Sequence, residues 1–404
     1  MHATAADAQP YLQVMDRFRE KKHHSAMRVL TLTPFYPTAS DDGAGGFIAE
    51  PLRDLERFGV NSCVLAVRPL HRGSAESNSI APAATWIRYP SVPGGIGLAS
   101  SGAFLYASLI SKVRKLHQRQ RIDLIHAHAA LPCGHAAVLL SRELNIPCVV
   151  TVHGLDAFFD NQVHGYAGQW CKRVARFVYR SASRVICISD KVAERVVKGT
   201  PAKVNTIYNG VDERMFCPAS TDCPSNTILS VGNLIPIKGH ELLLRALASV
   251  LPQYPNISCD IIGSGPELQR LAGLARECKI ADKVRFLGRQ SRKQVAEAMR
   301  RCILFALPSR YEGLGCVYLE AMSAEKPVIA CRGQGVDEII RHGGNGWLIE
   351  PGNLEELVAA LSMLLQNLKL RQQLGETARR TILQGFTTSH QATQLMLLYR
   401  ECVA

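Results

Sequence analysis

Short apolar runs alternate with helix-forming stretches along most of the chain. The apolar runs lie at 27–33, 62–67, 122–128, 147–152, 184–189, 227–231, 259–262, 283–288, 303–307 and 327–330. Most of them are followed by a loop of Gly or polar residues and then by a stretch with apolar positions at helical spacing. Strands that are apolar throughout are typical of parallel sheets, because helices cover both faces of such sheets. The pattern therefore predicts an α/β protein built from doubly wound parallel sheets.

The apolar runs fall into two groups, which indicates two domains. Residues 218–226 contain Pro, Ser, Thr and Asp without periodicity, as linkers do. A chain of 404 residues is also too long for one ordinary core. We therefore predict a loose extension over 1–26, a first domain over 27–217 and a second domain over 227–386. Residues 387–404 are expected to form a helix that packs back on the first domain.

Composition describes a folded protein of a reducing compartment. Hydrophobic residues make up 47% of the chain and charged residues 20%, which excludes an intrinsically disordered chain. The 13 cysteines are scattered, without a Cys-x2-Cys pair or a His/Cys cluster at zinc spacing. Residues 1–25 lack the apolar core of a signal peptide. We expect a cytoplasmic location, no disulfide framework and no structural metal.

An uncharged stretch over 89–110 raises the question of a membrane span. Pro93 and four glycines interrupt it, so we do not expect a spanning helix, although contact with a membrane interface stays open. The chain carries a net charge of +13, of which +9 lies in residues 1–216. This charge gathers in two helix-like stretches, at Lys112, Arg114, Lys115, Arg119 and Arg121, and at Lys172, Arg173, Arg176 and Arg180. Such faces either bind anionic headgroups or are simply solvated, and no nucleic-acid module accompanies them.

The segment from 303 to 330 holds the strongest candidate chemistry. A predicted strand ends at Leu307, and Glu312 follows in the loop at its carboxyl end, where open α/β sheets bind ligands. Gly313 and Gly315 expose backbone amides where a helix begins, and such amides attract phosphate and hydroxyl oxygens. Glu320 lies within that helix, up to about 12 Å from Glu312 if the gap is wholly helical.

This spacing favours a long ligand such as a nucleotide sugar, with hydroxyls at both ends and anionic oxygens between them. It does not suit a glycosidase, whose two carboxyl groups lie roughly 5–9.5 Å apart. Either glutamate alone is also explained by helix capping and packing. The whole arrangement favours a ligand site.

Other loops at predicted strand ends add polar candidates. Gly43, Gly45 and Gly46 follow the first strand, without the spacing of a dinucleotide or Walker loop. His153 ends a strand and precedes a glycine, and His128 ends another strand as the second candidate, although a lone histidine is more often structural. In the second half, Lys238 stands at a helix start, where it can meet a diphosphate. Gly265 belongs to a Gly-Ser-Gly-Pro loop, Asn233 follows a strand, and Arg289 follows another.

The segment from Glu312 to Glu320, followed by Glu-Ala-Met and Lys-Pro-Val-Ile-Ala, resembles the signature of the retaining GT-B glycosyltransferases, and specifically of glycosyltransferase family 4. The resemblance extends over nearly the whole chain from Met27. It implies two doubly wound parallel-sheet domains that face a central cleft. It also implies sugar transfer from a nucleotide-sugar donor with retained anomeric configuration, without a metal or other cofactor.

The resemblance also assigns roles to residues. Glu320 would hold the ribose and Lys238 the diphosphate, whereas Glu312 would hold the donor sugar and His153 would close over it. Asn233 stands where the family has an arginine, so the phosphate grip would depend more on Lys238. The remaining donor-site residues are Gly313, Leu314, Gly315, Cys316, Gly265 and Arg289, with the base near Arg289 and Gln290, and Gly45 and Gly46 form an acceptor or phosphate loop.

The expected partners are a nucleotide-sugar donor and a glycan or polyprenol-linked acceptor, with an anionic membrane surface as a further partner. Cell-surface polysaccharide synthesis at the inner face of the cell membrane would fit the basic first domain. Three alternatives stay open: a sugar-nucleotide epimerase, a phosphorylase with a lysine-bound pyridoxal phosphate, and a non-catalytic nucleotide-sugar-binding protein. Asn233 is the feature that favours the last of these.

Overall fold

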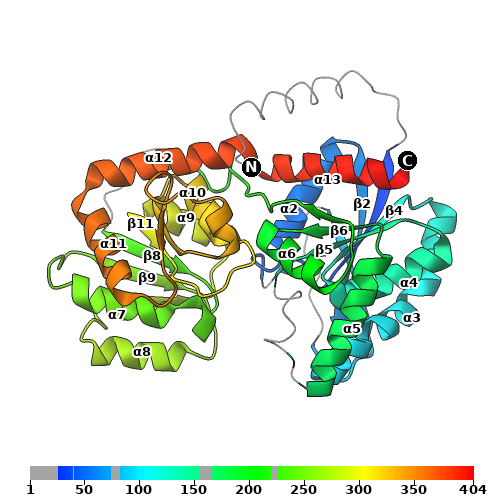
Figure 1. Ribbon diagram of the computed structural model, residues 1–404, viewed down its shortest axis with the longest axis horizontal. Helices are drawn as coiled ribbons and strands as arrows, with labels where there is room; N and C mark the ends of the chain where they lie inside the picture. The colour runs from blue at the N-terminus through cyan, green and yellow to red at the C-terminus, as the bar shows by residue number, and fades with distance from the viewer. Residues whose placement is uncertain (1–25, 40, 74–81, 155–162, 164, 220–225) are drawn as a thin grey trace.

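The protein is described by a computed structural model in which two α/β domains lie side by side (Figure 1). The described residues are 26–39, 41–73, 82–154, 163, 165–219 and 226–404. All but the last residue of the predicted extension over 1–26, and most of the predicted linker over 218–226, lie outside them.

The first domain is built around a sheet in which every described strand pair is parallel. Its strand order is β3-β2-β1-β4-β5-β6-β7. The strands are β1 (Met27–Thr33), β2 (Val60–Pro69), β3 (Ala84–Tyr89), β4 (Leu124–His128), β5 (Cys148–Val152), β6 (Arg184–Cys187) and β7 (Val204–Thr206). The helices are α2 (Gly46–Arg57), α3 (Gly95–Arg119), α4 (His135–Leu144), α5 (Gly165–Ser181) and α6 (Asp190–Gly199). The central strands are apolar because both of their faces are buried, as at Leu30 and Val150.

The second domain repeats this plan with the strand order β10-β9-β8-β11-β12-β13, again with parallel pairs. Its strands are β8 (Thr227–Val231), β9 (Ser258–Ile262), β10 (Val284–Gly288), β11 (Leu304–Ala306), β12 (Val328–Cys331) and β13 (Trp347–Ile349). Its helices are α7 (His240–Val250), α8 (Leu268–Glu277), α9 (Arg292–Arg301), α10 (Cys316–Ser323), α11 (Leu354–Gln366) and α12 (Leu368–Gly385).

Each sheet reverses its winding direction next to its first strand. In the first domain the chain runs outward from β1 to β3 and then returns to β4 beside β1. In the second domain it runs from β8 to β10 and returns to β11 beside β8. Ligands of open α/β sheets bind at the carboxyl ends of the strands at such reversals. The two reversals therefore mark where each domain can contribute to a site.

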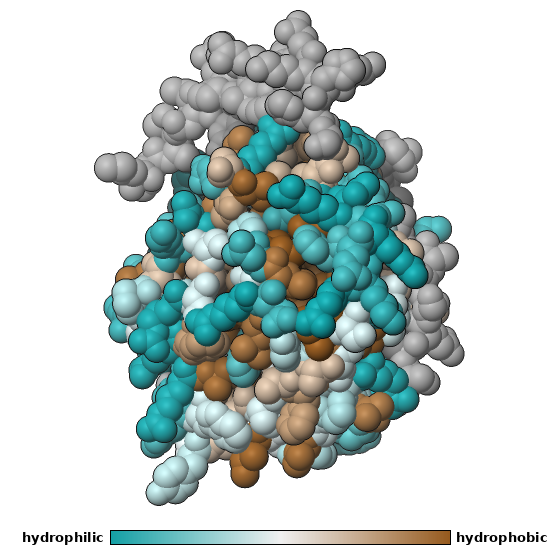
Figure 2. All heavy atoms as spheres, turned by 90° about the vertical axis from the view of Figure 1, so that its right-hand side faces the viewer, coloured by the Kyte–Doolittle hydropathy of each residue, from teal (hydrophilic) through white to brown (hydrophobic). Residues whose placement is uncertain are grey.

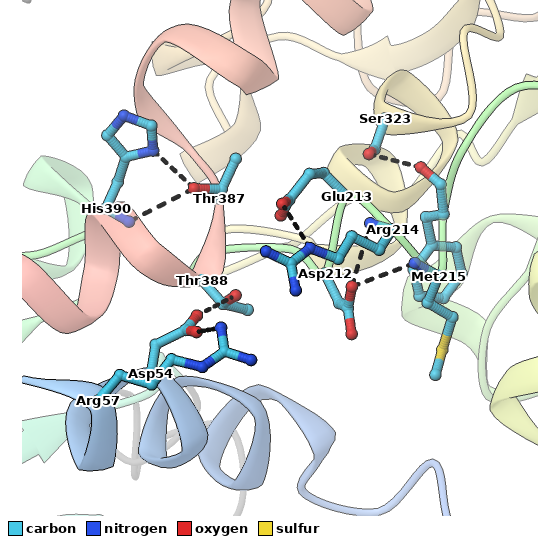
Figure 3. A network of polar contacts seen from close by, with 11 residues as sticks. Asp54, Arg57, Asp212, Glu213, Arg214, Met215, Ser323, Thr387, Thr388 and His390 are labelled. Atoms are coloured by element: carbon cyan, nitrogen blue, oxygen red, sulfur yellow. Dashed lines mark hydrogen bonds and ion pairs between the residues drawn. The ribbon is translucent and has the colours of Figure 1, made fainter.

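The last helix, α13 (Thr388–Val403), returns from the second domain to the first. Figure 1 shows α12 and α13 in succession along one edge of both domains, and α13 packs against α2. At the junction the Thr388 hydroxyl donates to Asp54 of α2 at 2.7 Å (Figure 3). The amide of Val211 also donates to the carbonyl of Phe386 at 2.9 Å. The end of the chain thereby ties the two domains together.

Helix α3 departs from what the sequence suggested for 89–110. Pro93 and the glycines were expected to interrupt that stretch, yet a helix begins at Gly95 and continues to Arg119. The glycines serve close packing: a Cβ on Gly97 would lie 1.4 Å from the carbonyl oxygen of Val92, and one on Gly102 would lie 2.5 Å from His135. By length and composition, α3 could cross a membrane, but partly buried helices of globular domains meet the same criterion, and 39% of its most apolar window is buried.

Candidate active site

A cavity of about 270 Å³ lies between the two domains. The first domain lines it with Asp41, Gly43, Phe47 and Glu50, and the second domain with Gly232, Asn233, Gly263, Arg289, Gln290, Arg292, Cys316 and Glu320. These residues follow β1 on one side and β8, β9 and β10 on the other, or begin α2, α9 and α10. The cavity therefore occupies the place where both sheets reverse their winding.

Arg292 joins two carboxylates from different domains. Its guanidinium lies 2.8 Å from Glu320 in α10 and 2.6 Å from Glu50 in α2. Its side chain also stacks over the ring of Phe216, with 5.0 Å between the guanidinium carbon and the ring centre. All three charged side chains are largely buried, so the interaction takes place at low effective dielectric.

Burial sets the protonation of this group. Desolvation raises the pKa of Glu50 to about 7, although the guanidinium of Arg292 opposes the rise. Desolvation also raises the pKa of Glu320, again against the effect of Arg292. For Arg292 itself, burial would lower the pKa, but the two carboxylates outweigh that effect and raise it. The arginine thus stays charged, whereas Glu50 gains or loses a proton near neutral pH.

Lys238 and Glu312 form a second ion pair next to the cavity. The Lys238 ammonium lies 2.6 Å from a carboxylate oxygen of Glu312, and the two side chains are 20% and 9% exposed. Lys238 ends a short 3-10 turn, and Gly239 then adopts a φ of +74° before α7 begins. The sequence treated these residues as separate contacts for phosphate and sugar, whereas the structure joins them in one pair.

Gly313 brings the second domain against the backbone of the first. Its carbonyl accepts a hydrogen bond of 2.6 Å from the Ser189 hydroxyl. A Cβ on Gly313 would lie 2.9 Å from the carbonyl oxygen of His153, and one on Gly154 would lie 3.0 Å from the Cα of Gly313. A side chain at either glycine would push the domains apart. Gly315, with a φ of +84°, then caps the start of α10.

His153 belongs to a buried chain of histidines. Its Nε2 lies 3.0 Å from Nδ1 of His128, and the two rings stack at 5.2 Å. Next to them, His126 contacts Thr151 and the Tyr399 hydroxyl of α13, each at 2.7 Å. Burial lowers the pKa of His126 and His153 to about 3 and that of His128 well below its usual value. At neutral pH these rings are therefore uncharged hydrogen-bonding groups.

The glycine loop after β1 begins α2 close to the arginine of the second domain. Gly45 has a φ of +84° and caps α2, and a Cβ there would lie 2.6 Å from the backbone of Phe35. A Cβ on Gly46 would lie 3.0 Å from Nε of Arg292. Both glycines are thus required by close packing, at Gly46 against a charged side chain from across the cleft.

The structure gathers part of the predicted site and separates the rest. Asn233, Arg289, Cys316 and Glu320 line the cavity. Leu314 is 1% exposed and belongs to the core. Gly265 is not among the residues that line the cavity, whereas Gly263 is, and a Cβ on Gly265 would meet the carbonyl of Leu234 at 2.3 Å.

Sequence reasoning missed four charged or polar parts of the site. These are Asp41, Glu50, Arg292 and the contact between His126 and Tyr399. The sequence analysis singled out neither Glu50, which lies in α2, nor Arg292, which the structure places directly after the capping residue Ser291. The available signal was the pair of acids, Asp41 and Glu50, on either side of the first glycine loop. Carboxylates that become buried between two domains need a cation, and an arginine of the second domain can supply it. Among the described residues, no group of three His, Cys, Asp or Glu side chains is placed to hold a metal ion.

Comparison with known proteins agrees with this architecture. Residues 42–214 match the family model described as Glycosyltransferase Family 4, and residues 219–381 match the model described as Glycosyl transferases group 1. Among solved structures, a sucrose-phosphate synthase from Thermosynechococcus elongatus aligns with a TM-score of 0.74 at 20% identity, over 93% of this chain and 98% of the other. HepE of Anabaena in complex with UDP-glucose has the same TM-score and identity, over 93% and 100%. The fold and its cleft are those of GT-B glycosyltransferases.

Relatives of known sequence narrow the class. An uncharacterised glycosyltransferase of Methanocaldococcus jannaschii is 31% identical over 267 residues, which are 66% of this chain and 72% of that protein. The N-acetyl-alpha-D-glucosaminyl L-malate synthase of Bacillus anthracis is 28% identical over 307 residues, 72% of this chain and 78% of that protein. The chain belongs to glycosyltransferase family 4 and is a glycosyltransferase.

Proposed function

We propose that this glycosyltransferase is retaining and metal-independent, and that it moves a sugar from a nucleotide-sugar donor to a glycan or lipid-linked acceptor in surface-polysaccharide synthesis. The observation that carries the proposal is the cavity between the domains, which Glu320 lines together with Asn233 and Arg289. The Lys238–Glu312 pair belongs to the same domain, outside the residues that line the cavity. The second domain (227–386) would hold the donor, and the first domain (27–217) would present the acceptor.

The donor would lie across the start of α10. Glu320 would accept hydrogen bonds from the ribose hydroxyls, and the diphosphate would approach Lys238 and the amides of Gly313 and Gly315. Glu312 would then turn from Lys238 towards the hydroxyls of the donor sugar. Gly232 and Gly263 leave room for close approach, because a glycine puts no side chain between backbone and ligand.

Catalysis would consist mainly of positioning and of charge stabilisation as the sugar–phosphate bond breaks. Lys238 would stabilise the departing diphosphate, because negative charge grows on its oxygens. His153 would bind the sugar as a neutral hydrogen-bonding group, since its pKa of about 3 keeps it uncharged. Closed domains would exclude water from the reacting carbon.

The test is a donor panel with product identification. Purified protein would be incubated with UDP-, GDP- and ADP-activated sugars and candidate acceptors, and the products analysed by mass spectrometry and NMR for anomeric configuration. HepE holds UDP-glucose in its solved complex, so uridine donors come first. We expect an acceptor-dependent product with retained configuration, lost in Glu312→Ala and Lys238→Ala but kept in the exposed controls Glu355→Ala and Lys293→Ala. Full turnover in both active-site variants would refute these roles.

We further propose that the first domain docks on an anionic membrane surface through the starts of α3 and α5. Exposed Ile96, Tyr166 and Trp170 line a hollow of about 350 Å³ together with Arg173. Arg173, Arg176 and Arg180 are exposed along α5, so an apolar hollow adjoins a basic row. Apolar and hydrophilic side chains are intermixed on the face of the first domain shown in Figure 2. Interfacial helices combine such groups, which insert between acyl chains and pair with headgroups.

Vesicle sedimentation tests this docking. The wild type should sediment with vesicles that contain phosphatidylglycerol and stay in solution with pure phosphatidylcholine. Arg173→Gln combined with Arg176→Gln should weaken sedimentation, because each basic residue near the surface contributes about 1 kcal/mol. The control replaces exposed Arg276 and Lys279 of the second domain with Gln. Equal sedimentation of the double variant and the wild type would contradict the proposal.

A further inference from the structure

The donor cavity has more acidic than basic side chains, which conflicts with an anionic ligand. Asp41, Glu50 and Glu320 line it, against Arg289 and Arg292, and Asn233 adds no charge. Lys238 is already paired with Glu312. A diphosphate brings further negative charge into this space. One of the two arginines must therefore turn from its carboxylates to the ligand.

Arg292 has an unpaired donor next to the glycine loop. Nη1 and Nη2 bind Glu320 and Glu50, but the buried Nε–H has no hydrogen-bond partner in the described part of the chain. Gly46 lies beside that nitrogen, since a Cβ added to Gly46 would be only 3.0 Å from it. An unpaired buried donor costs roughly 1–3 kcal/mol, so such a group calls for a ligand or a role.

The start of α2 supplies a second feature at the same place. The helix runs from Gly46 to Arg57, and its cap Gly45 offers no side chain to the first amides. Uncapped amides at a helix start favour anions. A guanidinium from the second domain and a helix start from the first therefore face each other at the cavity wall.

We propose that Arg292 is a diphosphate-binding residue of the donor site, which closes on the phosphates together with the glycine-loop end of α2. The inference rests on the proposed nucleotide-sugar donor. On binding, the ribose hydroxyls share the Glu320 carboxylate and release one side of the guanidinium for phosphate oxygens. Glu50 stays hydrogen-bonded to the other side, through its carbonyl oxygen when it is protonated, and so draws the first domain over the donor. A guanidinium suits this task because its planar fork binds two phosphate oxygens at once.

This arrangement couples donor binding to a proton. Glu50 faces Arg292 of α9, Glu320 of α10 and Asp212 of the segment after β7, and its pKa is already raised to about 7. A phosphate that arrives near Glu50 and takes part of the charge of Arg292 raises that pKa further. Binding therefore takes up a proton, and affinity for nucleoside diphosphates falls as the pH rises from about 6 to 8. Glu50→Gln, which cannot ionise, removes this dependence.

The test compares diphosphates with nucleosides by titration calorimetry. The probes are UDP, GDP and ADP with uridine, guanosine and adenosine, on the wild type and Arg292→Gln. We expect Arg292→Gln to weaken the diphosphate about tenfold or more and to leave the matching nucleoside within about threefold, since charged hydrogen bonds are the strong ones. The matched control is Arg300→Gln on the same helix, which removes the same charge and a contact to another segment, the hydrogen bond to the carbonyl of Met215 at 2.7 Å, at a residue that does not line the cavity.

A second variant separates phosphate binding from structural support. Asn233→Arg, added to Arg292→Gln, places a guanidinium back in the same cavity and should restore much of the diphosphate affinity. If Arg292→Gln does not fold, Arg292→Lys keeps a cation for the carboxylates, loses the fork, and should weaken diphosphate binding selectively.

Three outcomes overturn the inference. One is equal weakening of diphosphate and nucleoside, another is equal loss in Arg300→Gln, and the third is wild-type affinity in Arg292→Gln. In all three the wild type still binds a diphosphate, so the proposed function stands. If no diphosphate binds the wild type at all, the proposed function fails and the inference fails with it.

Discussion

The two walls of the cleft differ in how they carry charge. The second-domain wall has buried ion pairs, in which Lys238 holds Glu312 and Arg292 holds Glu320. The first-domain wall has uncharged rings, since burial keeps His153 and its neighbours neutral. Asp41 and Glu50 are acidic residues of the first domain that line the cavity, and burial raises the pKa of Glu50 to about 7.

This difference suggests a division of labour across the cleft. A buried lysine or arginine that is already paired with a carboxylate can exchange this partner for a phosphate oxygen of the diphosphate. Its charge is then never left unpaired at low dielectric. Neutral histidines can bind sugar hydroxyls without attracting the phosphates away from the second domain. The following predictions test this contrast, from the largest expected effect to the smallest.

Removing Glu312 should have the largest effect. Glu312→Ala leaves the Lys238 ammonium without its carboxylate at 2.6 Å and removes the proposed acceptor for the sugar hydroxyls. We expect kcat to fall by about 10²–10³, the usual cost of losing one preorganised polar contact in an active site. Steady-state kinetics with the donor found in the panel measure this. A fall below threefold would show that the charged wall does not act on the sugar.

Acid should destabilise the first domain through its histidines. Their pKa values are lowered to about 3 for His126 and His153, from an ordinary value near 6.5, so the unfolded chain binds more protons than the folded one below pH 6.5. Stability is therefore complete above that pH and falls as the pH drops, by up to about 1.4 kcal/mol per pH unit for each histidine.

Urea unfolding at pH 7.5, 6.0 and 5.0 would measure this slope. His126→Gln should make it shallower, whereas replacement of the exposed His71 by Gln should leave it unchanged. An equally steep slope in His126→Gln would place the acid sensitivity elsewhere.

Tyr399→Phe should destabilise the protein by about 1–3 kcal/mol, because the buried Nδ1 of His126 would lose its hydroxyl partner at 2.7 Å. Denaturant midpoints, with Tyr166→Phe as the exposed control, check the value. If both variants unfold like the wild type, α13 does not support the histidine chain.

His153→Ala should have the smallest effect on turnover, about tenfold in kcat/KM, since a neutral hydrogen bond contributes roughly 0.5–1.5 kcal/mol. A neutral ring also predicts that the pH profile of kcat between 5 and 8 is the same in His153→Gln and the wild type. A pH limb that disappears in the variant would mean that His153 ionises during turnover.

Much of the fold was predictable because it follows from the hydrophobic pattern within single strands and helices. Strands buried on both faces are mostly apolar, as 148–152 and 228–231 are apart from Thr151 and Ser230, and this made the parallel sheets recognisable. A candidate donor loop could also be proposed, because Glu312, Gly313, Gly315 and Glu320 lie close together along one strand–loop–helix unit. In such a unit, residues that are close in the sequence are also close in space.

Helix α3 shows where such patterns mislead. Glycines in 95–102 looked like breaks, because a glycine in a helix costs up to about 1 kcal/mol relative to alanine. The cost is offset where a neighbour leaves no room for a Cβ, as the carbonyl of Val92 does at Gly97. Such crowding depends on which residue packs against the glycine in the folded protein, so the hydrophobic periodicity of the sequence does not reveal it.

The sequence by itself determined the class of fold and the division into two sheets, and it picked out the two acids of the candidate donor loop, since all of these follow from hydrophobic period and near-neighbour spacing. Only the tertiary structure decided that Arg292 joins Glu50 to Glu320, that Lys238 pairs with Glu312, and that Tyr399 supports His126. These partners lie far apart in the chain, 273 residues for His126 and Tyr399. They meet because two domains and a returning helix bury polar groups against each other, and buried polar groups must find partners wherever the fold places them.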